Sequence, residues 1–389
     1  MRLSIASGLA VLGLALLGSA ACGGSGGGGK RVVELGRPEA SFARAGWRTD
    51  FARHRVPLEE IRSGGPPRDG IPPIDNPRPV EPRAAERFLS AREPVIAVEA
   101  GGAARAYPVR ILVWHEIVND RLGSRSIAVT YCPLCNSSIV FDRRVRGREL
   151  SFGTTGNLRR SNLVMWDRQT QTWWQQLTAE AIVGRLAGER LRPVGAQTLS
   201  WAQFKRRFPD GDVLAPETGE RGREYDRNPY LGYDEPASRP HLFRGPVDAR
   251  LAPKERVVAL LGARPPVVVP FSRLAREPAV AVAVRAGRVP AVVLYERGVA
   301  SAIDRDSVSE SKDVGTAGAF DRRLGARTLS FERRGAAFVD RETGSRWDVT
   351  GRAVAGRLGG QRLRPLRHDE QFWFSLAAFL PRARIAAGP

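Results

Sequence analysis

The chain has 389 residues, enough for two domains with separate cores, and 42% of them are hydrophobic. Its formal net charge is +20, a value that by itself is typical of nucleic-acid-binding proteins. Only four of the 61 basic residues are lysine, however, and the arginines are spread along the chain instead of clustering on one predicted helix. We therefore expect no nucleic-acid partner and assign the charge to contacts with anionic surfaces.

The amino terminus has the pattern of a bacterial export signal. A basic residue precedes an apolar run over residues 9–17, which is too short to span a membrane, and small residues lead into Cys22. This order predicts a signal peptide over residues 1–21, lipidation of Cys22 and a flexible tether over residues 22–49. The protein would then be extracytoplasmic, with the membrane of the cell envelope as its partner through the lipid anchor. A soluble secreted protein is the alternative.

The middle of the chain is typical of a β protein. Residues 50–83 are rich in proline and glycine and predict an irregular wrap, followed by a short helix over residues 82–92. Short β-branched or aromatic segments then alternate with turn residues, which favours antiparallel sheets over βαβ units. The expected strands are residues 95–98, 105–109, 127–131, 139–143, 149–152, 163–166 and 172–176.

The two halves of the sequence echo each other. Residues 141–144, Phe-Asp-Arg-Arg, recur as residues 320–323, and the Trp174 and Trp201 positions recur as Trp347 and Trp373. We expect a mainly β (α+β) fold of two tandem pseudo-symmetric β-rich repeats, each closed by a short helix. The predicted segments are repeat 1 over residues 84–214, a connector over residues 215–251 and a degenerate repeat 2 over residues 252–382.

Local signals predict how each repeat closes. Ser200 and Gln203 form a capping box at the start of a helix in the first copy, and Asp369 and Glu370 are expected to open the matching helix over residues 372–379. The second copy also carries an insertion near residues 304–318, which we place in a loop.

The cysteine pair Cys132-Pro-Leu-Cys135 occurs in the first copy only, where it follows an apolar predicted strand. Packing needs would be similar in two copies of one scaffold, so a pair of thiols in one copy indicates a site. With Cys22 lipidated, two cysteines remain in a compartment that permits oxidation.

A metal site is the first hypothesis for this pair. Cys132 and Cys135 would bring two thiolates to one ion, and His115 and Glu116, which precede the strand, would complete the ligand set. Soft thiolates favour Cu or Zn, and a metal-delivery protein would be the partner. The alternative is that one Cys-x-x-Cys supplies half a site and that His115 is structural.

Thiol-disulfide exchange is the second hypothesis, with Cys132 as the catalytic nucleophile, Cys135 as the resolving thiol and a redox protein as partner. No helix is predicted after the pair to lower a thiol pKa, so a structural disulfide in a non-catalytic binding module is a further alternative. Trp166, Trp173 and Trp174 would form the stacking platform of such a module, although Trp347 repeats one of them in the cysteine-free copy, which favours packing. Whether the protein is an enzyme stays open at this level.

Four longer motifs carry a family resemblance. They are residues 64–77 (Gly-Gly-Pro-Pro-Arg-Asp-Gly-Ile-Pro-Pro-Ile-Asp-Asn-Pro), 114–120 (Trp-His-Glu-Ile-Val-Asn-Asp), 129–136 and 167–170. Over about residues 58–381 the chain resembles the bacterial domain-of-unknown-function family numbered 3179. The resemblance implies a site at the cysteine pair and at His115-Glu116 without naming its chemistry. The chain departs from the family at Asn162, where an aspartate is usual.

Overall fold

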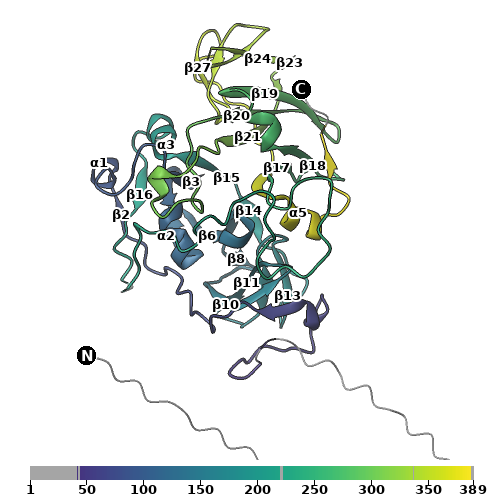
Figure 1. The fold of residues 1–389 in the computed structure, drawn as a ribbon. Coiled ribbons are helices and arrows are strands. Elements are labelled where there is room, and N and C mark those ends of the chain that lie inside the picture. The colour runs from purple at the N-terminus through teal and green to yellow at the C-terminus, as the bar shows by residue number, and fades with distance from the viewer. Residues whose placement is uncertain (1–41, 43, 220–221, 336, 387–389) are drawn as a thin grey trace, which may run out of the picture. The chain divides into compact units, whose positions relative to one another are not determined.

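The chain forms short strands that join into several sheets, with few and short helices (Figure 1). Strands make up 40% and helices 11% of the protein, which confirms the predicted mainly β class. The computed structural model describes residues 42, 44–219, 222–335 and 337–386, all of them within the unit Glu39–Pro389. The predicted signal peptide, Cys22 and most of the tether lie outside the described residues.

Three sheets are built from the first half of the chain. The first has the order β1-β10-β11-β12-β13, with β1 at Ile61–Ser63, β10 at Phe152–Arg159, β11 at Asn162–Asp167, β12 at Trp173–Gln175 and β13 at Glu180–Val183. The second has the order β14-β7-β6-β5, with β14 at Arg192–Val194, β7 at Ser137–Asp142, β6 at Arg125–Cys132 and β5 at Ile117–Leu122. The third has the order β15-β3-β4-β16-β2, with β15 at Ala196–Ser200, β3 at Pro94–Ala100, β4 at Ala103–Pro108, β16 at Asp212–Leu214 and β2 at Pro79–Val80.

Three further sheets come from the second half. One has the order β28-β17-β18-β29, with β28 at His368–Phe372, β17 at Arg256–Leu260, β18 at Val267–Pro270 and β29 at Arg384–Ile385. Another has the order β19-β20-β21, with β19 at Ala279–Ala286, β20 at Val289–Glu296 and β21 at Thr316–Asp321. The last has the order β24-β25-β26-β27, with β24 at Phe331–Arg334, β25 at Ala337–Asp340, β26 at Arg346–Trp347 and β27 at Ala353–Ala355.

Two small hairpins and eight short helical segments complete the described fold. The hairpins are β8 at Arg144–Val145 with β9 at Arg148–Glu149, and β22 at Arg323–Leu324 with β23 at Arg327–Thr328. The α-helices are α1 at Pro82–Ala85, α2 at Val109–His115, α3 at Trp201–Arg207, α4 at Phe271–Leu274 and α5 at Trp373–Phe379. The 3-10 turns are η1 at Leu58–Glu60, η2 at Pro133–Cys135 and η3 at Val308–Glu310. None of the helices in the described ranges has the length and apolar character that a membrane span needs.

The strands pair in the same order in the two halves. In the first half β3 pairs with β4 and β15, and β16 runs parallel to β4; in the second half β17 pairs with β18 and β28, and β29 runs parallel to β18. Phe141 lies opposite Pro193, and Phe320 lies opposite Pro365. These pairings support the repeat, but the superposition of residues 84–214 on residues 252–382 stays a prediction.

Local capping signals had mixed success. The capping box of Ser200 and Gln203 is confirmed at the start of α3. The helix expected over residues 82–92 is wrong beyond its first turn, because α1 ends at Ala85 and the following chain is held by turns, among them a hydrogen bond from the Ser90 amide to the Glu93 carboxylate at 2.9 Å. Side chains that bond nearby backbone groups in this way compete with a helix.

Two further elements differ from the expectation. Helix α2 was not predicted, because its buried sequence, Val-Arg-Ile-Leu-Val-Trp-His, is nearly apolar all round and has no helical period. Asp369 and Glu370 do not open α5; they lie on β28, opposite Ala259 and Val258 of β17. The placement of these two carboxylates was therefore wrong, since pairing with a partner strand outweighed the local charge signal.

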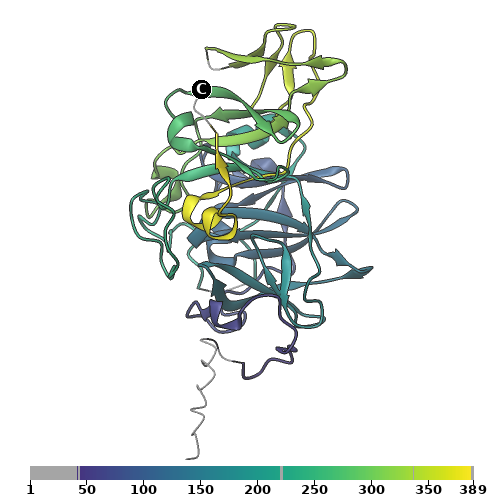
Figure 2. The same cartoon turned by 90° about the vertical axis from the view of Figure 1, so that its right-hand side faces the viewer.

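Elements of both halves meet in the buried cluster that contains the cysteines. Residues from β5, β6, β7, α2 and α5 pack in it together with both cysteines. Figure 2 shows α5, in yellow, at the junction between the blue and teal strands of the first half and the green strands of the second. A residue on α5 can therefore reach a site that the first half builds.

Candidate dithiol site

The Cys-Pro-Leu-Cys segment forms a tight turn between two paired strands. Strand β6 ends at Cys132, η2 covers Pro133–Cys135, and β7 begins at Ser137 after Asn136 has adopted a left-handed conformation. Side chains three residues apart lie on the same side of a 3-10 turn, so the two thiols face one direction. Both reach the same acceptor, the Ser161 carbonyl oxygen, which lies 3.9 Å from Cys132 Sγ and 3.3 Å from Cys135 Sγ.

Neighbouring side chains, and not a helix amino terminus, lower the pKa of one of the two thiols. Burial alone would raise the pKa of Cys135, but hydrogen bonds from Cys132, Ser375 and Asn162 outweigh it and hold the pKa below its ordinary value. Burial and the hydrogen bond with Cys135 raise the pKa of Cys132. The electrostatics therefore favour Cys135 as the thiolate, the reverse of the order expected from the sequence.

Asn162 is held in the orientation that this role needs. Its Oδ1 accepts hydrogen bonds from Gln175 Nε2 at 2.7 Å and from the Leu177 amide at 3.0 Å. An amide oxygen with two donors leaves Nδ2 to face the sulfur, and Nδ2 lies 3.5 Å from Cys135 Sγ. Ser375, on α5, has a buried hydroxyl with no other partner in the described residues, and it too lowers the pKa of Cys135.

Glu116 is an acid close to this pair in the fold. It ends α2 in a left-handed conformation, with φ of 57°, and its carbonyl oxygen accepts a hydrogen bond from the Tyr131 amide at 2.8 Å. This bond places it beside the end of β6, next to Cys132. Burial first, and then the neighbouring Cys132, raise the pKa of Glu116 well above its ordinary value. Glu116 therefore holds a proton more readily than an exposed carboxyl group does.

His115 does not join the cysteines. Its Nδ1 is 2.7 Å from the Pro72 carbonyl oxygen, and its Nε2 is 2.6 Å from the Tyr225 hydroxyl. Both ring nitrogens are thus engaged in tying α2 to the irregular wrap and to the connector. In the described ranges, no group of three or more His, Cys, Asp or Glu side chains is arranged to hold a metal ion. The structure therefore does not assemble the predicted metal set of Cys132, Cys135, His115 and Glu116.

A segment of the connector covers the pair. We call residues 225–248 the strap. Its Tyr225 contacts His115, its Tyr233 hydroxyl donates to the Leu134 carbonyl oxygen at 3.1 Å, and its His241 carbonyl oxygen accepts from Ser161 Oγ at 2.7 Å. Both thiols are buried beneath it, with Cys132 1% and Cys135 0% exposed. The strap must move before a large partner can touch either sulfur.

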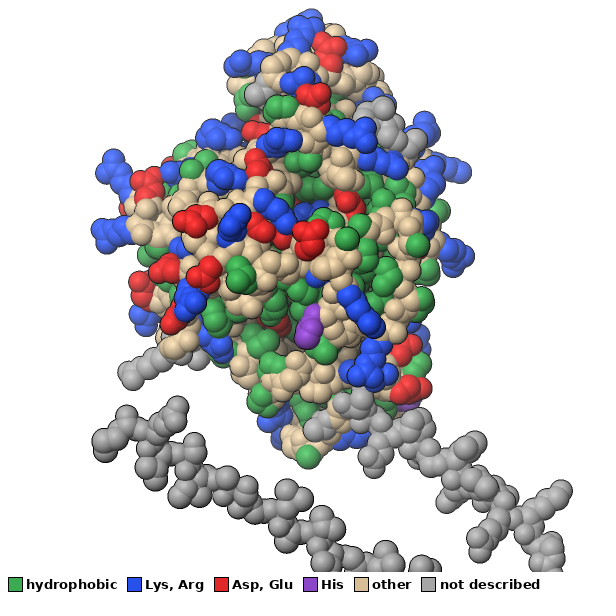
Figure 3. All heavy atoms as spheres, in the orientation of Figure 1, with side chains coloured by type: hydrophobic (Ala, Val, Ile, Leu, Met, Phe, Trp, Pro, Cys, Tyr) green, Lys and Arg blue, Asp and Glu red, His purple; other side chains and the backbone are tan. Residues whose placement is uncertain are grey.

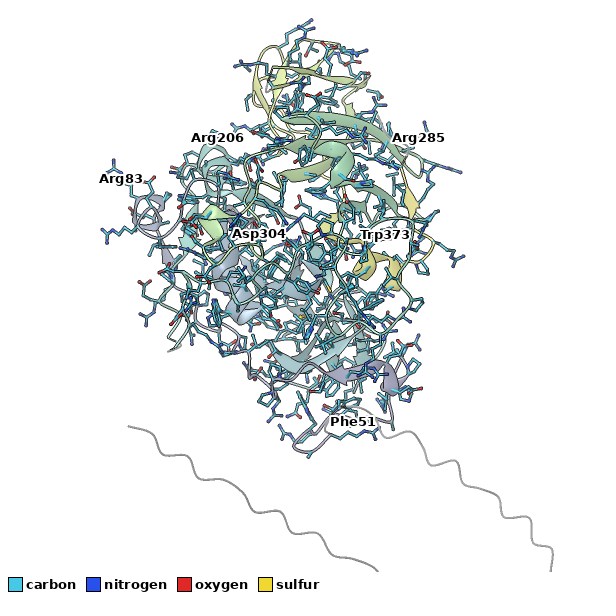
Figure 4. The ribbon with its side chains drawn as sticks, in the orientation of Figure 1. Phe51, Arg83, Arg206, Arg285, Asp304 and Trp373 are labelled. Atoms are coloured by element: carbon cyan, nitrogen blue, oxygen red, sulfur yellow. The ribbon has the colours of Figure 1, made fainter. Side chains whose placement is uncertain are left out.

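The second half holds the strap in place. Asp234 is fully buried and pairs with Arg256 at 3.0 Å and with Lys312 at 2.8 Å. The predicted insertion supplies further contacts, since the Gly232 amide donates to the Asp304 carbonyl oxygen at 2.6 Å. Farther along, Trp373 Nε1 donates to the Asp248 carbonyl oxygen at 3.0 Å. Figure 4 labels Asp304 and Trp373, which hold different parts of the strap.

The tryptophans considered as a stacking platform are core residues. Trp173 and Trp174 are 0% exposed and Trp166 is 6% exposed. Trp174 Nε1 donates to Asp167, and Trp347 Nε1 makes the same bond to Asp340 in the second half. This shared packing removes the platform as a reason to expect a binding module.

Sequence reasoning missed the residues that surround the sulfurs. Ser161 comes from a hairpin turn, Asn162 from the start of β11 and Ser375 from a helix of the other half. Only Asn162 had been noted, as a departure from a family pattern. Tyr233 lies in a segment that was expected to be a plain connector. Its aromatic composition was the one available signal that the connector covers something.

Comparison with known proteins adds a family and no activity. No curated protein and no solved structure matches the chain. A family model described as "Protein of unknown function (DUF3179)" matches residues 68–383, most of the chain. The match covers the cysteine turn, Glu116, the strap and α5. The chain therefore belongs to the DUF3179 family.

Proposed function

We propose that the protein is an exported, lipid-anchored dithiol that exchanges with a disulfide of a partner polypeptide. The observation that carries this proposal is the placement of Cys132 and Cys135 at one tight turn, with the Asn162 amide donating to Cys135. Two close thiols with one favoured thiolate are the parts that thiol-disulfide exchange needs.

The exchange follows from the two roles. The Cys135 thiolate attacks one sulfur of the partner disulfide, that S–S bond breaks, and the departing partner thiolate takes up a proton. A mixed disulfide then joins Cys135 to the partner. Cys132 loses its proton and attacks the Cys135 sulfur, which releases the second partner thiolate, and that thiolate takes up the proton. Two electrons pass to the partner, and Cys132 and Cys135 become a disulfide.

The two alternatives have less support. A metal would need further ligands, and His115, the expected one, already bonds Pro72 and Tyr225. A structural disulfide stabilises a fold chiefly by restraining a long loop of the unfolded chain, and this pair would close a loop of four residues only. Neither alternative explains why Asn162 and Ser375 direct donors at one sulfur.

The location in the cell envelope rests on the sequence pattern before Cys22, and the flexible tether would leave the site free to meet partners. A redox protein of the same compartment is the expected partner class. Such a partner restores the dithiol after each exchange, because the reaction consumes the two electrons that the pair holds.

Single-cysteine variants of the full chain test the proposal. The Cys132→Ser variant should accumulate a mixed disulfide between Cys135 and a disulfide-containing peptide, because the resolving thiol is gone. The Cys135→Ser variant should accumulate little of it. Both products are measured by mass spectrometry without reductant. Equal trapping by the two variants would contradict the assigned roles, and no trapping by either would contradict the function.

Elemental analysis of the same preparations distinguishes the metal hypothesis from thiol-disulfide exchange. Protein purified without oxygen should contain two thiols that react after unfolding and less than stoichiometric Cu or Zn. Stoichiometric metal that is lost in either cysteine variant would replace the exchange proposal by a metal site.

A further inference from the structure

A pocket opens between the two halves of the chain, and neither cysteine lines it. Its volume is about 460 Å³, within the range of about 300–1,000 Å³ typical of ligand sites. Its walls come from β3, β7, β14, β15 and the end of α3 in the first half, and from β21, β28 and the segment before β28 in the second. The pocket therefore exists only when the two halves are folded together.

The body of the pocket is apolar. Phe208 and Leu366 are partly exposed in it, and Val194, Leu199 and Leu363 form buried parts of its walls. Binding that removes such apolar surface from water is favourable. These walls fit a ligand with an apolar body.

One wall carries a carboxyl group without a hydrogen bond. Asp369 lines the pocket and is 8% exposed, and its Oδ2 is buried with no hydrogen-bond partner in the described residues. Burial raises the pKa of Asp369 to about 7, so the group holds its proton up to neutral pH. Buried polar groups in folded proteins nearly always have a partner. The protonated carboxyl group is thus a donor that lacks an acceptor.

Three arginines and one further carboxylate line the same pocket. Glu99 is shared by Arg207 at 3.1 Å and by Arg362 at 3.0 Å. Arg367 is exposed and forms no ion pair within the part of the chain that the structure describes. While the orphaned carboxyl group keeps its proton, the guanidinium groups therefore outnumber the ionised carboxylates. This balance favours an anionic group on the ligand.

We propose that this pocket binds a small monocarboxylate with an apolar body, whose carboxylate accepts a hydrogen bond from the Asp369 carboxyl group and faces the Arg367 guanidinium. Arg367 acts electrostatically on Asp369, so one ligand group can meet both. The arginines would repel an amine, and a neutral amide or alcohol would leave Arg367 without a counter-ion. This inference goes beyond the proposed function and does not depend on the thiols.

Three probes with the same apolar chain test the ligand class. Octanoate, octanamide and octylamine are titrated into the full-length protein by isothermal calorimetry. At about pH 6 we expect saturable binding of octanoate, with octanamide and octylamine at least about tenfold weaker. Phenylpropanoate in place of octanoate compares an aromatic body with an aliphatic one, and binding of either acid supports the proposal. Binding of neither acid, or equal binding of octylamine, would overturn it.

The pH dependence of octanoate binding tests the role of Asp369. Affinity should fall about tenfold between about pH 6 and about pH 8, because Asp369 loses its proton as the pH passes about 7 and then repels the ligand. The Asp369→Asn variant should bind equally at both values, since an amide donates at either pH. His368 also lines the pocket, but burial lowers its pKa, so its ring stays uncharged in this range. A full pH dependence in Asp369→Asn would contradict the assignment.

Arginine variants test the ion pair with the ligand. Arg367→Gln should weaken octanoate binding at least about fivefold. The matched control is Arg285→Gln, which changes an exposed arginine outside the pocket, labelled in Figure 4, and should leave affinity within about twofold. Far-ultraviolet circular dichroism checks that both variants are folded, and equal effects of the two would overturn the proposal.

The Cys132→Ser variant separates this inference from the proposed function. It should bind octanoate with wild-type affinity, because the cysteine turn does not line the pocket. Loss of octanoate binding in this variant would contradict a site that is independent of the thiols. If wild-type protein exchanges disulfides and binds no monocarboxylate, the pocket proposal fails and the proposed function stands.

Discussion

Cys135, the second cysteine of the pair, owes its favoured thiolate to neighbours that are distant in the sequence. Asn162 comes from the start of β11 and Ser375 from α5, and both lower the pKa of Cys135 against the effect of burial. In the absence of a long helix after the pair, these polar side chains provide the stabilisation that a helix amino terminus gives in other dithiols. The chemistry of the pair is therefore decided by tertiary contacts.

The Asn162→Asp variant tests this dependence. An ionised aspartate cannot donate to the sulfur and adds a negative charge beside it, so the pKa of Cys135 should rise. The pKa is measured from the pH dependence of alkylation in the Cys132→Ser background. Asn157→Asp is the control, because Asn157 is a buried asparagine on β10 that contacts Thr155. An unchanged thiol pKa in Asn162→Asp would show that the amide has no such role.

Some site residues could be predicted and others could not. Cys132 and Cys135 stand together at the end of β6, and Glu116 stands just before β5, the strand that precedes β6, so local patterns were enough to select them. His115 had the same signal and was placed elsewhere, because the end of α2 turns its ring toward Pro72 and Tyr225. Asn162 and Ser375 reach the sulfurs only through the folding of the two halves, and no sequence spacing reports such a contact.

At the scale of elements, the strap controls access to the thiols. Its buried Asp234 bonds Arg256, Lys312 and the Ser301 hydroxyl, so three groups of the second half hold one carboxylate. Removing one partner of a buried ion pair costs about 3–5 kcal/mol. Loss of this contact should favour states in which the strap has left η2.

The Asp234→Asn variant should therefore expose the pair. We expect the rate of thiol modification in the native protein to rise at least about tenfold, because each 1.4 kcal/mol or so in the opening equilibrium is tenfold. Glu235→Gln is the matched control, since Glu235 is the next residue of the same strap and is exposed. Far-ultraviolet circular dichroism confirms that both variants are folded. Equal rates in the two variants would refute the strap as a cover.

Strand β28 predicts a pH dependence of stability. Burial raises the pKa of Asp369 and of Glu370 to about 7, so both carboxyl groups hold protons more tightly in the folded chain than in the unfolded one. This contribution to stability is complete below pH 4 or so and is lost as the pH rises through about 7. The Asp369→Asn variant should make the decline shallower in urea unfolding experiments, with the part due to Glu370 remaining. The exposed Asp210→Asn control should keep it, and an unchanged profile in Asp369→Asn would contradict the assignment.

Most strands could be predicted from the sequence, whereas few helix boundaries could. Segments with alternating or β-branched residues, such as those of β6, β7 and β11, became strands close to the expected ranges. Helix α2 was missed because a fully buried helix carries no amphipathic period. The strap was read as a connector because irregular segments have no periodicity, and its covering role depends on what lies below it.

Across the molecule, the two halves share an order of strand pairing and differ at the cysteine turn. Where the first half has η2 between β6 and β7, the second has a longer segment with η3 between β20 and β21. That segment carries Asp304 and Lys312, which hold the strap. The second half thus contributes to the site as a support.

Figure 3 shows Lys and Arg side chains spread over the visible face of the molecule.

The lipid anchor is a separate prediction about the whole chain. In the expressing bacterium, wild-type protein should fractionate with membranes, and Cys22→Ser should move it to the soluble fraction, because lipidation requires that thiol. Immunoblots of the two fractions measure the change. Cys132→Ser is the control and should stay with the membranes. A Cys22→Ser protein that remains membrane-bound would contradict the anchor.

The most direct test of the account is a redox titration of the full-length protein. Samples equilibrated at a series of thiol-disulfide ratios are quenched with acid, unfolded, alkylated and weighed by mass spectrometry. We predict one reversible transition in which the Cys132 and Cys135 thiols disappear together, with a partner-linked form trapped only through Cys135. Two thiols that never oxidise, or a pair that never reduces in the native protein, would contradict the proposed exchange.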